Sequence, residues 1–155
     1  MDFKHLSGID NATILIKNQI ANFLDDHLDE YADNILNIHR GLDFALSKYP
    51  HQGGFVMLAK ERNDILGAVV VCQTGMEGFV SENLLIYMAV HRDHRRKGIG
   101  KALMEKTLER AKGDIALHVD PQNPAMTLYK SMGFRERFVE MRLRRQRRFH
   151  GILLD

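Results

Sequence analysis

The sequence predicts an α/β protein with a mixed, mostly antiparallel central sheet and helices on both of its faces. Two segments near the N-terminus carry apolar residues at helical spacing, and two apolar runs, 55–59 and 65–72, flank a short polar turn. From residue 84 onward, apolar runs alternate with helical spacing. Apolar runs are typical of buried strands, whereas steps of three and four residues indicate amphipathic helices. Because helices between strands pack on the faces of a sheet, both faces are expected to be covered.

The first fifty residues predict one strand and two helices. The strand is expected at 2–6, and the first helix begins near Asp10 and Asn11. The second helix is expected to run from Tyr31 to Tyr49, because a proline and then a glycine pair follow it.

Acidic residues gather in the same region. Asp25, Asp29 and Asp33 recur every four residues, which predicts that they share one helical face. Such a face would attract a cationic ligand, although an ordinary solvated surface is the alternative.

The middle of the chain predicts a β-hairpin and a further strand. The runs 55–59 and 65–72 flank the turn candidates Asn63 and Asp64, and the next apolar run covers 84–90. The single cysteine, Cys72, lies within an apolar run. This position favours a small buried residue over a nucleophile.

A basic, glycine-containing turn follows the run 84–90 and leads directly into a helical pattern. Its glycines allow the backbone to approach a ligand closely, and the first amides of the helix point at that ligand with the positive end of the helix dipole behind them. The alternative is a solvated loop. The pattern predicts an anion-binding turn made by Arg95, Arg96, Lys97, Gly98, Ile99, Gly100 and Lys101.

Two nucleotide-binding motifs are excluded by spacing. A dinucleotide fingerprint would require a glycine where the chain has Leu103. The P-loop pattern would require a glycine where the chain has Arg95.

The last third of the chain predicts a strand at 115–119, a helix and a closing hairpin. Phe138, Val139, Met141 and Leu143 alternate with charged residues, which indicates a strand. A short last strand is expected from Phe149 to Leu154. The C-terminal basic tail, 142–155, is expected to be solvated. Contact with nucleic acid is not expected, because base stacking requires aromatic residues and only Phe149 is near.

Length and composition predict a single domain over residues 1–155. The chain is 45% hydrophobic, which is ordinary for a globular protein of this size. No apolar run approaches the roughly 20 residues of a membrane-spanning helix, and the first residues lack the order of a secretion signal. We therefore expect a cytoplasmic protein without a membrane partner.

Two motifs resemble the signatures of the GNAT family of N-acetyltransferases. Arg95, Gly98 and Gly100 fill the R/Q-x-x-G-x-G/A pattern. Downstream, the second signature, N-x-x-A-x-x-L-Y-x-x-x-G-F, is matched except at its asparagine, where the chain has Gln122 and Asn123 lies one residue later. The resemblance covers about residues 54–136, and the second motif is filled by Ala125, Leu128, Tyr129, Gly133 and Phe134.

The resemblance implies an acyl-CoA N-acyltransferase-like fold, with acetyl-CoA as co-substrate and no metal. The turn would bind the pyrophosphate, Asn123 would contribute to cofactor binding, and the strand residues Met88, Ala89 and Val90 would lie along the pantetheine. Tyr129 would contact the cofactor and protonate the departing thiolate. The implied reaction is direct attack by a primary amine of a small molecule, peptide or protein, held in line with the thioester.

The general base is less defined. The family often places a glutamate where this chain has Leu84, and Glu82 would share its face in a regular strand. His118 is another candidate, whereas His91 and His94 are expected to support the anion-binding turn. The histidines lack the spacing of a zinc site.

Alternatives remain open at this stage. The chain could be a non-catalytic acyl-CoA-binding module, or a nucleic-acid-associated module that uses its arginine-rich C-terminus. A homodimer is compatible with the sequence, and the amine acceptor is not identified by it.

Overall fold

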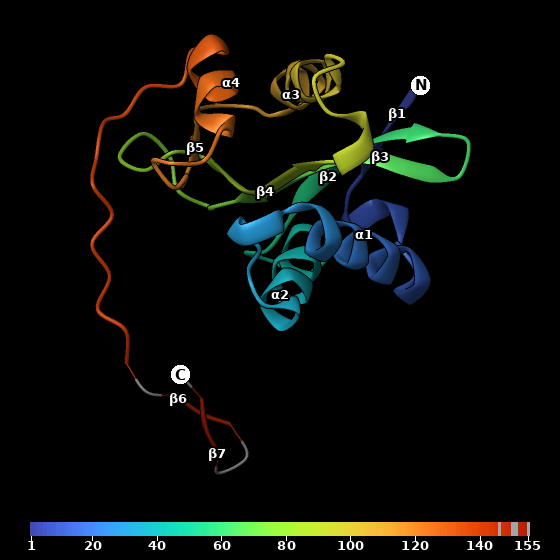
Figure 1. Ribbon diagram of the computed structural model, residues 1–155. Helices are drawn as coiled ribbons and strands as arrows, with labels where there is room; N and C mark the ends of the chain where they lie inside the picture. The colour runs from blue at the N-terminus through green and yellow to red at the C-terminus, as the bar shows by residue number, and fades with distance from the viewer. Residues whose placement is uncertain (146, 150–151, 155) are drawn as a thin grey trace.

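A five-stranded sheet separates two layers of helices in the computed structural model, which describes residues 1–145, 147–149 and 152–154 (Figure 1). The strand order is β1-β2-β3-β4-β5; neighbouring strands are antiparallel except for the parallel pair β4–β5. The predicted fold class is therefore confirmed. The strands are β1 (Asp2–Leu6), β2 (Gly54–Glu61), β3 (Asp64–Gln73), β4 (Asn83–Val90) and β5 (Ile115–Leu117).

Helices α1 (Ile14–His27) and α2 (Ile35–Ala45) cover one face of the sheet. Thr13 caps α1 by accepting a hydrogen bond from the backbone of Ile16, and Asn34 caps α2 in the same way. Both helices are shorter than the sequence pattern predicted, because a 3₁₀ helix, Asp29–Tyr31, stands between them. Their apolar faces bury a core that includes Ile20, Leu24, Ile38, Leu42, Val56 and Val70.

Helices α3 (Ile99–Arg110) and α4 (Ala125–Ser131) cover the opposite face. Leu103 and Met104 of α3 are fully buried against β2 and β3 side chains such as Met57 and Val69. The core on this face reaches Tyr129 of α4. Two further 3₁₀ helices, Gly8–Asp10 and Arg92–His94, complete the described helices.

The predicted hairpin is confirmed as β2–β3. Glu61 pairs with Asp64, so the turn consists of Arg62 and Asn63, with Arg62 at a φ of 57°. Cys72 is buried on β3, as predicted, and burial raises the pKa of its thiol to about 11. Such a thiol is a poor nucleophile at neutral pH.

A β-bulge in β4 changes which side chains face each helical layer. Val70 pairs with Tyr87 and Val71 with Leu85, which leaves Ile86 as the extra residue. As a result Ile86 and Tyr87 both pack on the α1–α2 side, whereas Leu85 and Met88 pack on the α3–α4 side. Bulges often re-aim side chains in this way.

The sheet opens between β4 and β5. These strands pair only through 83–85 and 115–117. From Ile86 to Val90, the one neighbour of β4 in the described sheet is β3. The predicted strand at 115–119 is thus shorter than expected, and its end marks the fork at which the two strands separate.

The prediction that the C-terminal segment closes this sheet was wrong. Residues 135–145 form no strand, and β6 (Arg147–Phe149) pairs with β7 (Ile152–Leu154) in a separate two-stranded sheet. Residues 150 and 151 of the expected last strand lie outside the described residues. The alternating pattern indicates an extended segment, but it does not specify the strand with which that segment pairs.

Every helix in the described ranges is too short or too polar to cross a membrane.

Candidate functional site

The predicted anion-binding turn, residues 95–101, connects the end of β4 to α3. Its backbone has left-handed φ values of 61° at Arg96 and 82° at Gly98. Residues with a side chain rarely adopt such φ values without backbone strain, which explains the glycine at position 98. A Cβ placed on Gly98 would meet no atom within 4 Å, so the space in front of the turn is open.

The backbone amides of this turn are free to bind a ligand. Residues 96–101 donate no backbone hydrogen bond to any described residue, and the first bond into α3 runs from the Ala102 amide to the Gly98 carbonyl at 3.1 Å. Free amides at the positive end of a helix dipole form an anion site. The side chains of Arg96, Lys97 and Lys101 are exposed beside it.

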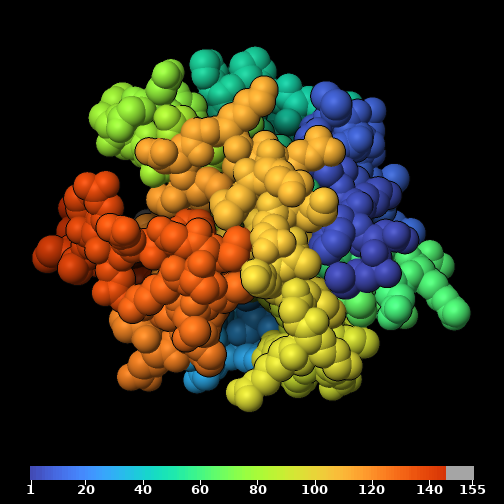
Figure 2. All heavy atoms as spheres, turned by 90° about the horizontal axis from the view of Figure 1, so that it is seen from above, coloured from blue at the N-terminus to red at the C-terminus, as the bar shows by residue number. Residues whose placement is uncertain are grey.

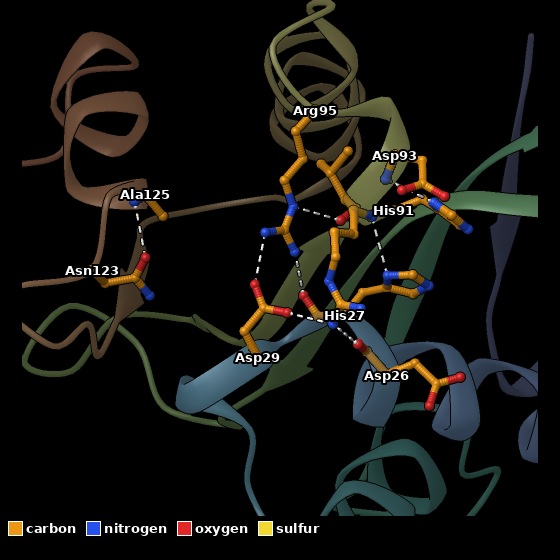
Figure 3. A network of polar contacts seen from close by, with 10 residues as sticks. Asp26, His27, Asp29, His91, Asp93, Arg95, Asn123 and Ala125 are labelled. Atoms are coloured by element: carbon orange, nitrogen blue, oxygen red, sulfur yellow. Dashed lines mark hydrogen bonds and ion pairs between the residues drawn. The ribbon is translucent and has the colours of Figure 1, made fainter.

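Arg95 has a different role from its basic neighbours, because its guanidinium points away from the turn toward the α1–α2 connection (Figure 3). Nε donates to the Val90 carbonyl at 3.1 Å, and Nη2 donates to the His27 carbonyl at 2.7 Å. Nη1 pairs with Asp29 Oδ2 at 2.7 Å. The Arg95 side chain therefore holds the turn in position, and the backbone amides of residues 96–101 stay without a partner among the described residues.

Asp29 joins two arginines of the same loop. Its Oδ1 pairs with Arg92 Nη2 at 2.8 Å, while its Oδ2 accepts from Arg95. Hydrogen bonds from Arg92 and Arg95 lower the pKa of the Asp29 carboxyl. Sequence spacing did not reveal this clasp, because no periodic relation connects Asp29 with either arginine.

The prediction that three aspartates share one helical face was wrong. Helix α1 ends at His27, and Asp29 follows in a 3₁₀ helix with a φ of 55°. Asp33 precedes α2 and has separate partners. The change in backbone conformation after His27 breaks the four-residue periodicity on which the prediction depended.

Histidines pack behind the clasp. His27 Nδ1 accepts a hydrogen bond from the Arg92 amide at 3.1 Å, and its ring centroid lies 4.2 Å from that of His91. His91 in turn lies 5.1 Å from His94. Burial, followed by the charges of His91 and Arg92, lowers the pKa of His27, so the neutral ring that accepts this bond is favoured. The prediction that His91 and His94 support the turn agrees with this packing.

The open part of the sheet lies beside the turn. A Cβ on Gly100 would lie 3.4 Å from Leu128 Cδ2 and 3.5 Å from Met88 Cε, so Gly100 faces both β4 and α4. Met88 and Val90 pack on this side, whereas Ala89 packs on the other face. Figure 2 shows a hollow here between α4, in orange, and the turn with α3, in yellow.

Tyr129 of α4 lies in the core beside this hollow. Its side chain is 8% exposed and its ring packs edge-on against Phe134, with centroids 5.9 Å apart. Burial raises the pKa of its phenol to about 12. No described residue is hydrogen-bonded to its hydroxyl, and the described side chains contain no fully enclosed polar atom without a partner, so the hydroxyl retains access to solvent. A neutral donor is therefore available.

Asn123 begins the segment that leads into α4. Its Oδ1 accepts from the Ala125 amide at 2.9 Å, as Figure 3 shows, which fixes the start of the helix. The adjacent Gln122 carbonyl accepts from the hydroxyl of Tyr31 at 3.2 Å. Tyr31 thus connects the α1–α2 segment to the β5–α4 loop.

Glu82 lies immediately before β4, at the end opposite to the turn. Its Oε2 accepts from the Asp114 amide at 3.0 Å, and its side chain packs against Gly113. Backbone hydrogen bonds lower the pKa of Glu82, which is opposite to the shift that a base near neutrality requires. This environment favours a structural role. His118 is exposed and directly follows β5 at the fork.

The contact between Tyr87 and Asp33 was not predicted from the sequence. The Tyr87 hydroxyl donates to Asp33 Oδ2 at 3.0 Å, and Asp33 Oδ1 accepts from Asn37 Nδ2 at 3.1 Å. Burial and the Asp33 carboxylate raise the pKa of Tyr87. The bulge at Ile86 directs Tyr87 toward this face. The one feature of the sequence that could have indicated this contact is a tyrosine within an otherwise apolar strand.

Within the described ranges, His, Cys, Asp and Glu side chains form no group of three or more that could hold a metal ion.

Comparison with known proteins gives one family match. Residues 52–136 match the family model of the acetyltransferase (GNAT) domain. Cysteine-rich protein 2-binding protein of Mus musculus is 36% identical over 56 residues, which cover 36% of this chain and 7% of that protein. The chain thus spans a small fraction of the length of this relative.

Solved structures share the fold at low sequence identity. The ribosomal-protein-alanine N-acetyltransferase of Brucella melitensis matches with a TM-score of 0.61 and 18% identity, covering 93% of this chain and 98% of that one. An aminoglycoside acetyltransferase from an uncultured soil metagenomic sample matches with a TM-score of 0.61 and 23% identity, covering 92% and 97% respectively. At these sequence identities the similarity shows a shared fold and nothing finer.

Proposed function

Because the chain belongs to the GNAT family of acetyltransferases, we propose that it transfers an acetyl group from acetyl-CoA to a primary amine of a small molecule or peptide. The observation that carries this proposal is the run of free backbone amides at residues 96–101. These amides would bind the pyrophosphate of acetyl-CoA, and Arg96, Lys97 and Lys101 would add positive charge.

The fork between β4 and β5 would receive the rest of the acetyl-CoA molecule. The backbone of residues 86–89 is not paired with β5, so its outer groups are available to the pantetheine amides, whereas the Val90 carbonyl already accepts from Arg95. A main-chain amide on this edge would stabilise the charge that develops on the thioester oxygen. Met88 and Val90 provide an apolar wall on the α3–α4 side.

Tyr129 would act on the departing thiolate. With a phenol pKa of about 12 and a thiol pKa of about 8.5, complete proton transfer is uphill by about 5 kcal/mol. We therefore expect Tyr129 to donate a hydrogen bond that stabilises the thiolate as it forms, with the final proton coming from solvent.

The amine would approach from the α1–α2 side of the fork. Asp33 lies there, hydrogen-bonded to Tyr87 of β4, and its carboxylate would attract the protonated amine. His118 and an ordered water are candidate acceptors of the proton, while Glu82 is a weaker candidate because of its lowered pKa. The reaction would otherwise depend on holding both substrates in line. We place this reaction in the cytoplasm.

Two measurements test the proposal. Calorimetry with acetyl-CoA measures binding alone, and thiol release across a panel of amines measures transfer. Binding with thiol release for at least one amine supports an enzyme. Binding without thiol release for any amine class supports a non-catalytic acyl-CoA-binding module, and absence of binding contradicts the proposed site.

A further inference from the structure

Two histidines hold the short 3₁₀ helix that leads into the predicted anion-binding turn. The Arg92 amide donates to His27 Nδ1 at 3.1 Å. The Asp93 amide donates to His91 Nδ1, also at 3.1 Å, and the His94 amide donates to the His91 carbonyl at 2.9 Å. All three amides of this helix therefore have partners, whereas those of the turn that follows have none among the described residues.

His27 has a second contact with the same loop. It is the last residue of α1, and its backbone carbonyl accepts from Arg95 Nη2 at 2.7 Å (Figure 3). Its ring centroid lies 4.2 Å from that of His91. Because Arg95 is the first residue of the turn, the end of α1 is joined to the loop at two points. Displacement of the His27 ring would therefore reach the backbone of the turn.

Both rings accept a hydrogen bond through Nδ1, so this atom must carry no proton. A neutral histidine has one ring nitrogen that accepts, whereas a protonated histidine has two N–H groups and no acceptor. A proton on Nδ1 would place one N–H against another and remove the bond to the loop. Burial, followed by the charges of His91 and Arg92, lowers the pKa of His27, which agrees with a neutral ring in the folded protein.

The rings can exchange protons with solvent. His27, His91 and His94 line a hollow between α1, the β2–β3 hairpin and the loop. A proton on either of the first two rings would add positive charge beside two arginines, while the carboxylates nearby are all exposed and therefore screened by solvent. The charged groups around the pair are Asp26 of α1, Glu61 and Asp64 of the hairpin, and Arg92, Asp93 and Arg95 of the loop.

We propose that His27 and His91, in their neutral forms, hold the turn in the geometry that binds acetyl-CoA, and that protonation of either ring releases it. This inference rests on the proposed function, because acetyl-CoA is the ligand. If the bound form requires neutral rings, binding at low pH must displace protons, and acetyl-CoA affinity falls as pH falls. Attraction between a protonated histidine and the phosphates would give the opposite sign. The hydrogen bonds act directly on the loop, whereas that attraction is screened by salt.

Calorimetry with acetyl-CoA at pH 8 and pH 5.5 is the first test. The double variant His27→Asn/His91→Asn keeps an oxygen that can accept the same hydrogen bonds and does not titrate. Between the two pH values, wild-type affinity should fall about fivefold more than that of the variant, which is the effect of about one hydrogen bond. The 3′-phosphate of acetyl-CoA, with a pKa of about 6, affects both proteins equally and cancels in this comparison. His51→Asn changes an exposed histidine elsewhere and should behave as the wild type.

Amide hydrogen exchange without ligand is the second test. Corrected for the pH dependence of exchange itself, protection of the Arg92 and Asp93 amides should fall between pH 8 and pH 5.5 in the wild type and persist in the double variant. If circular dichroism shows that the double variant is unfolded, His91→Asn alone serves for both measurements, since asparagine is favoured where a helix begins.

The outcomes separate this inference from the proposed function. Acetyl-CoA affinity with the same pH dependence in wild type and variant, a relative rise in wild-type affinity at pH 5.5, or unchanged protection of both amides would overturn the inference while leaving the proposed function intact. Absence of acetyl-CoA binding at both pH values would contradict the proposed function, and this inference with it.

Discussion

Asp29 and Arg95 form an ion pair of 2.7 Å although 66 residues separate them in the sequence. The pair connects the 3₁₀ helix that follows α1 to the loop that carries the free backbone amides. The position of those amides therefore depends on a contact from the opposite face of the sheet. The first prediction follows from this dependence.

Asp29→Asn should weaken acetyl-CoA binding about fivefold, because both arginines lose their charged partner and the pairs are partly exposed. Turnover at saturating substrate should change less, since Asp29 does not face the reacting atoms. Calorimetry measures the affinity, and Asp25→Asn is the control, because Asp25 is an exposed aspartate on the preceding helix, α1. Equal effects of both variants would contradict a positioning role for Asp29.

Gly98→Ala should reduce acetyl-CoA affinity at least about tenfold. A side chain at a φ of 82° strains the turn, and its Cβ would enter the space in front of the free amides. Gly75→Ala provides a control, because Gly75 also has a positive φ and open space around it. Both variants should lose about 1 kcal/mol of unfolding free energy. Only the Gly98 variant should lose affinity in calorimetry.

Gly100→Val tests the adjoining wall of the hollow. The added side chain would fill the space between α3, Met88 and Leu128, so we expect weaker acetyl-CoA binding while the circular dichroism spectrum and melting temperature stay close to those of the wild type. Unchanged affinity would count against the proposed path of the pantetheine.

Tyr129→Phe should lower turnover roughly 100-fold with little change in acetyl-CoA affinity, because the hydroxyl acts on the thiolate only as it departs. The raised pKa of the phenol keeps it protonated up to about pH 12, so its contribution should not titrate away between pH 7 and 10. Steady-state rates over this pH range provide the measurement. A loss of affinity with preserved turnover would make Tyr129 a binding residue instead.

Glu82→Gln separates the two roles considered for this carboxylate. A general base would show its loss most strongly at low pH, where few amine molecules are deprotonated. The lowered pKa leads us to expect the wild-type pH–rate profile. Stability should change instead: a lowered folded pKa stabilises the protein above the unfolded pKa of the group, and this contribution is lost as pH falls through the folded pKa. Denaturant unfolding between pH 3 and 7 should show a smaller pH dependence in the variant.

The sequence predicted the parts of the site that depend on local backbone conformation. Gly98 could be recognised because a tight turn before a helix requires a residue that tolerates positive φ, and Tyr129 lies within a recognisable motif. The Asp29 clasp could not be predicted, because it joins distant residues through tertiary packing. The bulge at Ile86 carries no glycine to mark it, so counting alternate residues along β4 did not reveal that Tyr87 faces Asp33.

The end of the chain illustrates the same limit. Alternation from Phe138 to Leu143 predicted a strand, but residues 135–145 form none. Strand partners are set by the available sheet edges and not by the segment itself.

The free amides of residues 96–101 also bear on how far this sequence can diverge. Main-chain donors are present whatever side chains the turn carries, so we expect substitutions at Arg96, Lys97, Ile99 or Lys101 to alter the strength of the proposed anion site without abolishing it. Selection on the anion site then acts mainly on the two glycines and on the arginine that anchors the loop. A short, sparse motif is therefore the expected trace of this site in distant homologues, and overall identity can fall far while the site persists.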